Sequence, residues 1–329
     1  MKICVIPGDG VGVEVMESCL DVLRAVTHNF DFIFADAGME CYRKHGTYLP
    51  EETVEKIKIC SATLFGAVTT DYSADYKSPV LTLRKNFDLY ANLRIIKSLH
   101  NRCMKNMDLV IVRENTEGLY VQRERGGKNR VIAEKVVSKK GCERIIKFAF
   151  EYAEINKRKR ITCVHKANVL RKSDGMFRKI FYEIADEYGI DAVDCLVDAC
   201  AMHLIKNPEK FDVIVTLNLY GDILSDEASA LVGGLGFVPG ANIGRDYAIF
   251  EPAHGSAPDI AGKDIANPTA MIMSGGMMLR YLGMNRECDI IEKALRKVFE
   301  KGVFTQDVDG KHGTKKFTKE VIKETKQFI

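Results

Sequence analysis

The arrangement of strand-like and helix-like segments most constrains the fold of this 329-residue chain. Short apolar runs rich in β-branched residues are expected to form strands at 2–6, 31–36, 62–68, 160–166, 192–197 and 211–216. Segments with helical spacing of apolar residues lie between or after them, at 13–26, 51–59, 141–155, 199–205, 269–283, 288–301 and 317–327. Because strands that alternate with helices pair in parallel through helical crossovers, the pattern predicts an α/β protein with a mostly parallel sheet covered on both faces.

Composition excludes several classes of protein. The chain has 46% hydrophobic residues and no low-complexity tract, so we expect it to be folded throughout, as two domains or one large α/β unit. The 48 basic and 45 acidic residues are spread along the chain and leave a formal charge of only +3, which does not call for nucleic acid. The densest basic run, 157–160, lies between a helix and a strand and is typical of a solvated turn.

The ten cysteines are scattered, with no Cys-x-x-Cys pair, which is typical of reduced thiols in the cytoplasm rather than a disulfide framework. The chain opens at once on a strand, so we expect no signal peptide. No apolar run approaches the length of a membrane span. We therefore expect a soluble, cytoplasmic protein without a membrane partner.

Two carboxylates mark the segment 217–236, which follows a strand and reads as a helix that stops at paired glycines. Asp222 and Asp226 stand four residues apart, so both lie on one helix face, where two oxygen ligands of a hard divalent cation could sit. The alternative is that Asp222 caps the helix and Asp226 is a first-turn acid favoured by the helix dipole. Asp198, at the start of the helix 199–205, is a third candidate ligand or base, with helix capping again as the alternative.

Three arginines occupy positions that are costly for a charged residue. Arg84 would project from a helix that Ser78 and Pro79 begin, and Arg94 and Arg113 from apolar strands. Together they suggest a substrate with more than one carboxylate, although any one alone could be an ordinary surface arginine paired with an acid. Lys166 stands at the carboxyl end of a strand, where ligands of α/β proteins usually bind.

Two glycine-containing segments are candidate ligand loops. Pro7 to Gly12 turns a strand into a helix, where glycines let the backbone approach a ligand closely, but it lacks the Gly-x-Gly-x-x-Gly fingerprint of a Rossmann unit. The second segment, 248–268, is expected to be a long loop rich in small residues. Loops of that length inside a compact domain are usually functional.

These segments together resemble the β-decarboxylating dehydrogenases that act on isocitrate, 3-isopropylmalate and homoisocitrate. The resemblance runs through Ile6–Gly10, LYANLR, VRENTEGLY, HKANVL, GDILSDEAS and EPAHGSAPDIAGKDIANP, and so covers nearly the whole chain. It implies a doubly wound, non-Rossmann α/β fold of the isopropylmalate dehydrogenase type. It also implies a discontinuous large cofactor-binding domain, 1–97 with 236–329, a smaller domain, 98–235, and an active site shared across a homodimer.

The family's functional residues carry over to matching positions of this sequence. The resemblance implies that Arg84, Arg94 and Arg113 bind the substrate carboxylates, that Tyr120 is the catalytic acid, and that Lys166 of the partner subunit relays a proton. It implies a Mg²⁺ or Mn²⁺ ion held by Asp222, Asp226 and the partner's Asp198. Bound there, the cation would lower the pKa of the substrate hydroxyl and stabilise the enolate left by decarboxylation.

The resemblance also indicates which nicotinamide cofactor to expect. Family members that use NAD share the Ala-Pro-Asp-Ile-Ala-Gly pattern found here, in which the acid accepts hydrogen bonds from the adenosine ribose. Asp259 would repel the 2′-phosphate of NADP, so we expect NAD. The cofactor-binding residues implied are His254, Gly255, Ser256, Ala257, Asp259, Ile260 and Asn267.

The start of the helix that carries Arg84 sets the substrate preference. Residues 76–80 resemble the Tyr-x-Ser-Pro-(Ile/Val) pattern of homoisocitrate enzymes of archaea, and Ser78 could bond a distal carboxylate of a di- or tricarboxylate substrate. Val80 and Leu81 could equally line an isopropyl pocket, so 3-isopropylmalate is the second candidate substrate after homoisocitrate, and isocitrate is the third. Either of the first two would imply a role in amino-acid biosynthesis. One departure is Ile95, where the family commonly has proline.

Two other classes of function share some of these sequence features. A noncatalytic regulatory subunit of a hetero-oligomeric dehydrogenase would usually lack catalytic residues, whereas this chain has the full set. A metal-dependent lyase or phosphate-binding protein without redox activity would not need the loop that follows His254.

Overall fold

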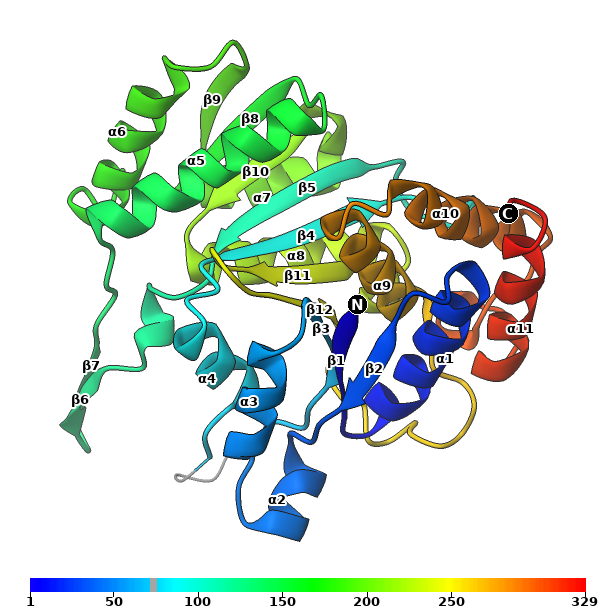
Figure 1. Ribbon diagram of the computed structural model, residues 1–329. Helices are drawn as coiled ribbons and strands as arrows, with labels where there is room; N and C mark the ends of the chain where they lie inside the picture. The colour runs from blue at the N-terminus through cyan, green and yellow to red at the C-terminus, as the bar shows by residue number, and fades with distance from the viewer. Residues whose placement is uncertain (72–75) are drawn as a thin grey trace.

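A computed structural model describes residues 1–71 and 76–329 of the chain. Within them a single ten-stranded sheet crosses the molecule, in the order β2-β1-β3-β12-β11-β4-β5-β10-β8-β9, and a separate hairpin pairs β6 with β7 (Figure 1). The strands are β1 (Lys2–Gly8), β2 (Asp31–Phe34), β3 (Ala62–Ala67), β4 (Ala91–Lys97), β5 (Asp108–Glu114), β6 (Glu124–Gly127), β7 (Arg130–Ala133), β8 (Arg160–His165), β9 (Asp191–Leu196), β10 (Val213–Thr216), β11 (Pro239–Ile243) and β12 (Ala248–Pro252).

Eleven helices accompany these strands in the described part of the chain. They are α1 (Val11–Val26), α2 (Met39–His45), α3 (Glu51–Lys58), α4 (Pro79–Asn86), α5 (Lys139–Ile155), α6 (Ser173–Ala185), α7 (Val197–Lys206), α8 (Asn218–Leu231), α9 (Thr269–Tyr281), α10 (Asn285–Glu300) and α11 (Thr314–Thr325). The predicted alternation of strands and helices is confirmed. The expected loop at 248–268 is partly wrong, because its first five residues form β12 between β11 and β3.

The sheet is mixed, but six of its nine strand pairings are parallel, which confirms the expectation of a mostly parallel sheet. β2, β1, β3 and β12 are parallel to one another, and so are β5, β10, β8 and β9. Between these two blocks, β11 pairs antiparallel with both β12 and β4, and β4 pairs antiparallel with β5. The two parallel blocks are therefore joined by an antiparallel centre.

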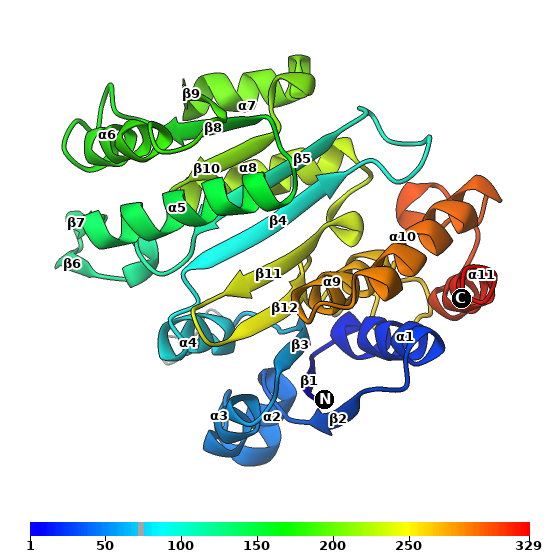
Figure 2. The same cartoon turned by 45° about the horizontal axis from the view of Figure 1, so that its top comes forward.

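Helices cover both faces of the sheet, as Figures 1 and 2 show. Alternate residues of β5 point to opposite faces, so Val110 and Val112 pack into the core that includes α1, α5 and α9, whereas Leu109 and Ile111 pack against α7 and α8. The fold is thus a doubly wound α/β architecture, as predicted. In the described part of the chain, no helix is long and apolar enough to cross a membrane.

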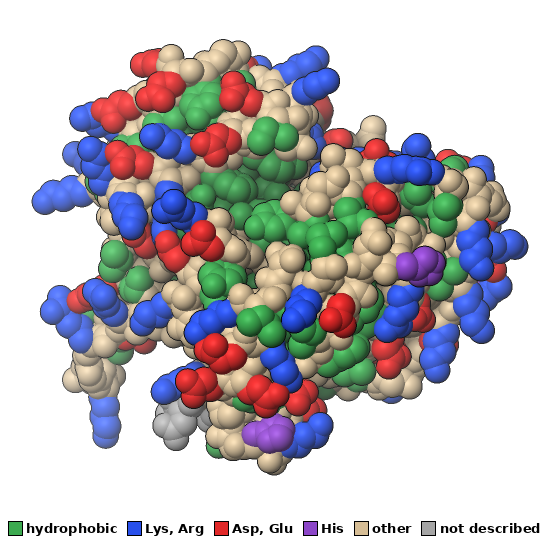
Figure 3. Space-filling view, viewed as in Figure 1, with side chains coloured by type: hydrophobic (Ala, Val, Ile, Leu, Met, Phe, Trp, Pro, Cys, Tyr) green, Lys and Arg blue, Asp and Glu red, His purple; other side chains and the backbone are tan. Residues whose placement is uncertain are grey.

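The antiparallel centre has different surroundings on its two faces. On one face Leu93 and Ile95 of β4 line a largely apolar cavity of about 470 Å³, bounded by α5 and α9. Figure 3 shows apolar side chains gathered in this hollow. On the other face Asn92 and Arg94, which alternate with them, lie in a polar environment. Arg94 therefore lies on the polar face, whereas the opposite face is largely apolar, with Lys97 of β4 among the residues that line its cavity.

Candidate active site

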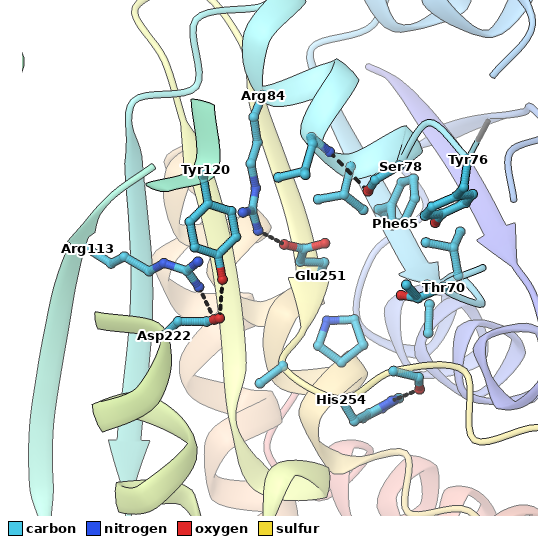
Figure 4. Close-up of a pocket in the computed structure, with 18 of the residues that line it drawn as sticks. Phe65, Thr70, Tyr76, Ser78, Arg84, Arg113, Tyr120, Asp222, Glu251 and His254 are labelled. Carbon is cyan, nitrogen blue, oxygen red and sulfur yellow. Dashed lines mark hydrogen bonds and ion pairs between the residues drawn. The ribbon is translucent and has the colours of Figure 1, made fainter. Parts of the chain in front are cut away.

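A cavity with a volume of about 960 Å³ lies on the polar face, at the antiparallel centre. Eight of the residues predicted to bind substrate, metal or cofactor line it: Ser78, Arg84, Arg94, Arg113, Tyr120, Asp222, His254 and Gly255. Figure 4 shows how several of them converge from α4, β5, α8 and the segment after β12. The sequence places these residues up to 177 positions apart, and the sheet brings them to one cavity.

The three predicted arginines are buried, with 7%, 6% and 1% of Arg84, Arg94 and Arg113 exposed. Burial lowers the pKa of the Arg84 guanidinium to about 10, a shift that the charge of Glu251 opposes and those of Arg113 and Arg94 reinforce. Burial also lowers the pKa of Arg94. Three buried cations that repel one another around a cavity form a site for a ligand that carries several negative charges.

Helix α4 begins as predicted, with Pro79 in its first turn and the Ser78 hydroxyl accepting a hydrogen bond from the Leu81 amide at 3.4 Å. Capping places Ser78 at the cavity wall together with Val80 and Leu81. Thr70, Tyr76 and Gln122 also line this wall. This part of the cavity wall therefore contains hydroxyl and amide groups beside two apolar side chains.

Asp222 is the acid at the centre of the site. Its carboxylate pairs with the Arg113 guanidinium and accepts a hydrogen bond from the Tyr120 hydroxyl, and the Arg113 guanidinium lies 5.0 Å from the centre of the Tyr120 ring. Burial tends to raise the pKa of Asp222, but the charge of Arg113 and the hydrogen bond from Tyr120 hold it below its usual value. Burial raises the pKa of Tyr120, so the phenol keeps its proton at neutral pH.

Neither Asp222 nor Asp226 caps a helix, which corrects the alternative reading of these residues. Helix α8 begins at Asn218, four residues earlier than Asp222, and its first turn contains no acid. The Asn218 side chain does not cap the helix, because it binds the Arg113 guanidinium and the Glu117 carbonyl. Asp222 and Asp226 therefore lie in the middle of α8, where helix capping does not explain them.

The pair Asp222 and Asp226 has the character of a cation site. Burial and the negative charge of Asp222 raise the pKa of Asp226. The Asp226 carboxylate makes no hydrogen bond or ion pair with the residues that the structure describes, whereas its neighbour stays ionised. Two adjacent carboxylates, one without a partner, suit a divalent cation with oxygen ligands. Within residues 1–71 and 76–329, no group of three or more histidine, cysteine or acidic side chains forms a complete metal centre.

Lys166 and Asp198 do not line the cavity. They pair with each other at 2.5 Å, and this hydrogen bond lowers the pKa of Asp198. Asp198 lies in the first turn of α7, where Leu196 occupies the capping position, so it is not the helix cap. The chain thus presents two separate groups, the cavity with Asp222 and the exposed Lys166–Asp198 pair.

Buried polar residues hold Lys166 in place. The carboxylate of Asp174, fully buried, accepts a hydrogen bond from the Lys166 amide at 2.8 Å and pairs with Lys135. His165 accepts a hydrogen bond from the Ala167 amide at 3.0 Å and contacts Asp194 through its other ring nitrogen at 2.9 Å. His165 is therefore a structural residue that fixes the turn after β8.

We expect the stability contributed by Asp194 to depend on pH. Burial tends to raise the pKa of this carboxyl, but hydrogen bonds from Arg178, Tyr182 and His165 hold it well below its usual range. A carboxyl with a lowered folded pKa stabilises the protein above its unfolded pKa, near 4, and this contribution disappears as the pH falls through the folded value.

Asp194→Asn should therefore cost about 1–3 kcal/mol of unfolding free energy at pH 7. Urea unfolding of both proteins at pH 7 and at pH 3.5 measures the difference, which should have begun to decrease at the lower pH, because the carboxyl of the unfolded chain is then partly protonated. A difference that is constant with pH, or that widens on acidification, would contradict this assignment.

The predicted cofactor residues are split between the cavity and the loop behind it. His254 and Gly255 line the cavity, and the buried Nε2 of His254 has no hydrogen-bond partner among the described residues. Ser256 contacts the Thr69 hydroxyl at 2.8 Å. Ala257, Asp259 and Ile260 lie in the turns that follow, and Asp259 is exposed. Asn267 is used internally, since it accepts from the Thr269 amide and donates to Asp307.

The glycines after β1 approach other parts of the protein closely. A side chain on Gly10, whose φ is +55°, would come within 2.1 Å of the Ser256 carbonyl, and one on Gly12 within 2.5 Å of the Pro7 carbonyl. The Val11 amide donates to the same Ser256 carbonyl at 2.8 Å. Gly10 therefore lets the segment after β12 pack onto the start of α1, and Gly12 lets α1 begin close to β1.

Several site residues were not predicted, chiefly the buried polar groups behind the arginines. Glu251 pairs with Arg84 at 3.4 Å, and three asparagines contact the arginines. A signal was present for two of these asparagines, because Asn92 and Asn242 interrupt otherwise apolar strands, where an uncompensated amide is costly.

Comparison with known proteins places this architecture and site in one family. The family model for isocitrate/isopropylmalate dehydrogenase matches residues 2–324, and the chain belongs to this family. The chain is thus an oxidoreductase of the isocitrate/isopropylmalate dehydrogenase type, from a family whose members use a divalent metal and a nicotinamide cofactor.

Similar relatives carry different substrate names. Homoisocitrate dehydrogenase of Methanocaldococcus jannaschii is 51% identical over 98% of this chain and 97% of the relative. The 3-isopropylmalate dehydrogenase of Methanothermobacter thermautotrophicus is also 51% identical, over 98% of each chain. Among solved structures, isocitrate dehydrogenase from Methylococcus capsulatus matches with a TM-score of 0.96 and 44% identity, covering 99% of both chains.

Proposed function

We propose that this protein catalyses the NAD-dependent, divalent-metal-dependent oxidative decarboxylation of a 2-hydroxy acid with a β-carboxylate, and that the acid is homoisocitrate. The observation that carries the proposal is the convergence of three buried arginines with Tyr120 and Asp222 on one cavity. Buried guanidiniums bind carboxylates strongly and with defined geometry. A complete set of such residues argues against a noncatalytic regulatory subunit.

The residues present fit a metal ion and a nicotinamide cofactor. Asp222 and Asp226 would hold Mg²⁺ or Mn²⁺, and the unpartnered ring nitrogen of His254, with Gly255 and the loop to Asn267, would receive the cofactor. When bound, the two groups supply Lewis acidity at the substrate hydroxyl and a hydride acceptor. The exposed carboxylate of Asp259 would repel a 2′-phosphate, which favours NAD.

The remaining functions, substrate binding and proton transfer, are assigned to individual side chains. Arg84, Arg94 and Arg113 hold the substrate carboxylates and so orient the reacting carbon atoms. Tyr120, whose raised pKa keeps it protonated, donates a proton to the carbon that loses its carboxylate. Lys166 of the partner subunit takes the proton of the substrate alcohol.

A second copy of the chain would complete the site. The apolar side chains of Met202 and Ile205 on α7 and Ile223 on α8 are 48%, 46% and 56% exposed, and the two helices contact each other. Adjacent exposed apolar residues of this kind mark an interface. We propose a homodimer in which the pair Lys166 and Asp198 of each subunit reaches the cavity of the other.

Two broader features belong to the same proposal. We place the boundary of the large domain, 1–97 with 236–329, and the smaller domain, 98–235, at the antiparallel centre of the sheet, because the cavity lies there. All ten cysteines are free thiols, which supports a reducing compartment and a cytoplasmic enzyme.

The polar residues of the cavity wall near the start of α4 favour homoisocitrate as the substrate. Ser78, Thr70, Tyr76 and Gln122 offer hydroxyl and amide groups to a distal carboxylate, whereas an isopropyl group could form no hydrogen bond with them. The second candidate is 3-isopropylmalate, which Val80 and Leu81 in the same wall favour. Isocitrate ranks third.

A panel of homoisocitrate, isopropylmalate, isocitrate and malate, each with NAD and with NADP, tests this function. We expect the highest kcat/KM with homoisocitrate and NAD, an absolute need for Mg²⁺ or Mn²⁺, and NADP at least about tenfold less effective. Formation of NADH absorbance at 340 nm is the readout. Faster turnover of isopropylmalate would replace the substrate assignment, and no reduction of either cofactor with any acid would refute the activity.

A further inference from the structure

All three arginines of the cavity are held in the same way. Each donates its Nε–H to the side-chain oxygen of an asparagine, and none of these three bonds goes to a carboxylate. The pairs are Arg84 with Asn242 at 3.1 Å, Arg94 with Asn92 at 2.8 Å and Arg113 with Asn218 at 2.9 Å.

A bond at Nε fixes a guanidinium without using its outer edge. The group is planar and carries five N–H donors, so holding the inner nitrogen sets the plane and leaves both terminal nitrogens free for the cavity. One terminal nitrogen of Arg113 meets Asp222, and one of Arg84 lies 3.4 Å from Glu251. The terminal nitrogens of Arg94 make no hydrogen bond or ion pair with the described residues.

The asparagines are themselves fixed by the register of the sheet. Asn92 of β4 stands directly opposite Asn242 of β11 on one side and Arg113 of β5 on the other. Asn92 donates its amide to the Asn242 oxygen at 2.8 Å, and Asn242 donates to Glu251 at 2.7 Å. The arginines are thus anchored to three neighbouring strands and α8, which are rigid elements.

Because the amide oxygens are neutral, they bind the arginines without reducing the positive charge of the cavity. An aspartate of the same shape would accept the same Nε–H but would cancel one positive charge at each position. With asparagine there, the carboxylates near the three guanidiniums are Glu251, Asp222 and Asp226. An aspartate at any of the three asparagine positions would add a further negative charge and weaken the attraction of the cavity for an anionic ligand.

We propose that Asn92, Asn218 and Asn242 are positioning residues for substrate binding, which fix the arginine planes and preserve their positive charge for a substrate with several carboxylates. This inference rests on the proposed function. On this inference, substrate affinity depends on the side chain being a neutral amide and not a carboxylate, as well as on its hydrogen bond to arginine.

Asn92 offers the sharpest test, because its oxygen contacts only Arg94 among the described residues. Asn92→Asp keeps an acceptor at the same place and adds a charge, whereas Asn92→Ala removes the acceptor and keeps the cavity charge; both remove the amide donor to Asn242. Binding of tricarballylate, a tricarboxylate that cannot be oxidised, is measured by isothermal titration calorimetry at one fixed Mg²⁺ concentration. Thermal unfolding of each variant is measured in parallel.

We expect tricarballylate to bind wild type best, Asn92→Ala less well, and Asn92→Asp at least about tenfold more weakly than wild type. Both variants lose the amide donor to Asn242, and Asn92→Asp should be more stable than Asn92→Ala, because its carboxylate keeps the hydrogen bond to Arg94 and relieves the repulsion among the cations. In the reaction, Asn92→Asp should lose kcat/KM mainly through KM. A hydrogen bond with a purely structural role predicts the opposite order of affinities, with Asn92→Asp nearer to wild type than Asn92→Ala.

The control is Thr318→Val, which removes a buried hydrogen bond to the Thr314 carbonyl on α11. It should lower the melting temperature and leave tricarballylate affinity unchanged. Affinity of Asn92→Asp within twofold of wild type would overturn the inference while the proposed function stands. Failure of wild type to bind tricarballylate would overturn the carboxylate site itself, and the inference with it.

Discussion

An Asp226→Asn enzyme is expected to turn over substrate at less than about one hundredth of the wild-type rate, because one of the two carboxylates proposed to hold the divalent cation is gone. Its melting temperature should no longer respond to Mn²⁺. Wild type should gain about 2.7 kcal/mol of unfolding free energy at a Mn²⁺ concentration 100 times the dissociation constant. Differential scanning calorimetry with and without Mn²⁺, beside NADH formation, measures both effects.

The fold should survive this change. Burial and the charge of Asp222 raise the pKa of Asp226, and its carboxylate has no partner in the described part of the chain. A carboxyl with a raised folded pKa destabilises the folded protein at pH values above that pKa, so metal-free Asp226→Asn should be at least as stable as wild type at pH 7.

Glu227→Gln is the matched control for Asp226→Asn, since it removes one negative charge from the next residue of α8. It should retain both turnover and the stabilisation by Mn²⁺. A normal response of Asp226→Asn to Mn²⁺ would mean that the cation binds elsewhere.

Lys166→Ala is expected to lower kcat by about 10²–10⁴-fold and to change KM only a few-fold, because the lysine moves a proton and does not bind a carboxylate. Removal of the Lys166 ammonium also frees Asp198, whose pKa the lysine lowers by a hydrogen bond. A small primary amine such as ethylamine, added to the assay, should restore part of the lost rate, and steady-state kinetics over a range of amine concentrations measures the rescue.

The exposed Lys172, six residues further along, provides the control. Lys172→Ala should behave as wild type and should show no response to ethylamine. If Lys166→Ala kept its kcat and instead raised KM strongly, the lysine would be a substrate-binding residue and not a proton carrier.

The sequence predicted local features of the fold well and long-range ones less well. Ser78 and Pro79 begin α4 as expected, because capping depends on a few neighbouring residues. Strand direction is decided by pairing with distant segments, so the antiparallel placement of β4 and β11 could not be read from their residues. Pro239 and Gly240 further obscured β11, since neither favours a strand interior.

Within the site, residue types were predictable and their surroundings were not. The three arginines were identified because charged residues are rare in buried positions, and the structure buries all three. The alternative in which Asp222 caps the helix was wrong, because α8 begins at Asn218, whose side chain binds Arg113. The amide contacts of Asn92 and Asn242 depend on register across the sheet, which local sequence does not contain.

Subunit mixing tests the shared active site most directly. Asp226→Asn and Lys166→Ala homodimers should each be nearly inactive. After the two are denatured together in equal amounts and refolded, each heterodimer should contain one intact site, with Asp226 from one subunit and Lys166 from the other. About a quarter of the wild-type specific activity should return. Activity no higher than that of the separate variants, with heterodimers demonstrated by native mass spectrometry, would show that each subunit works alone.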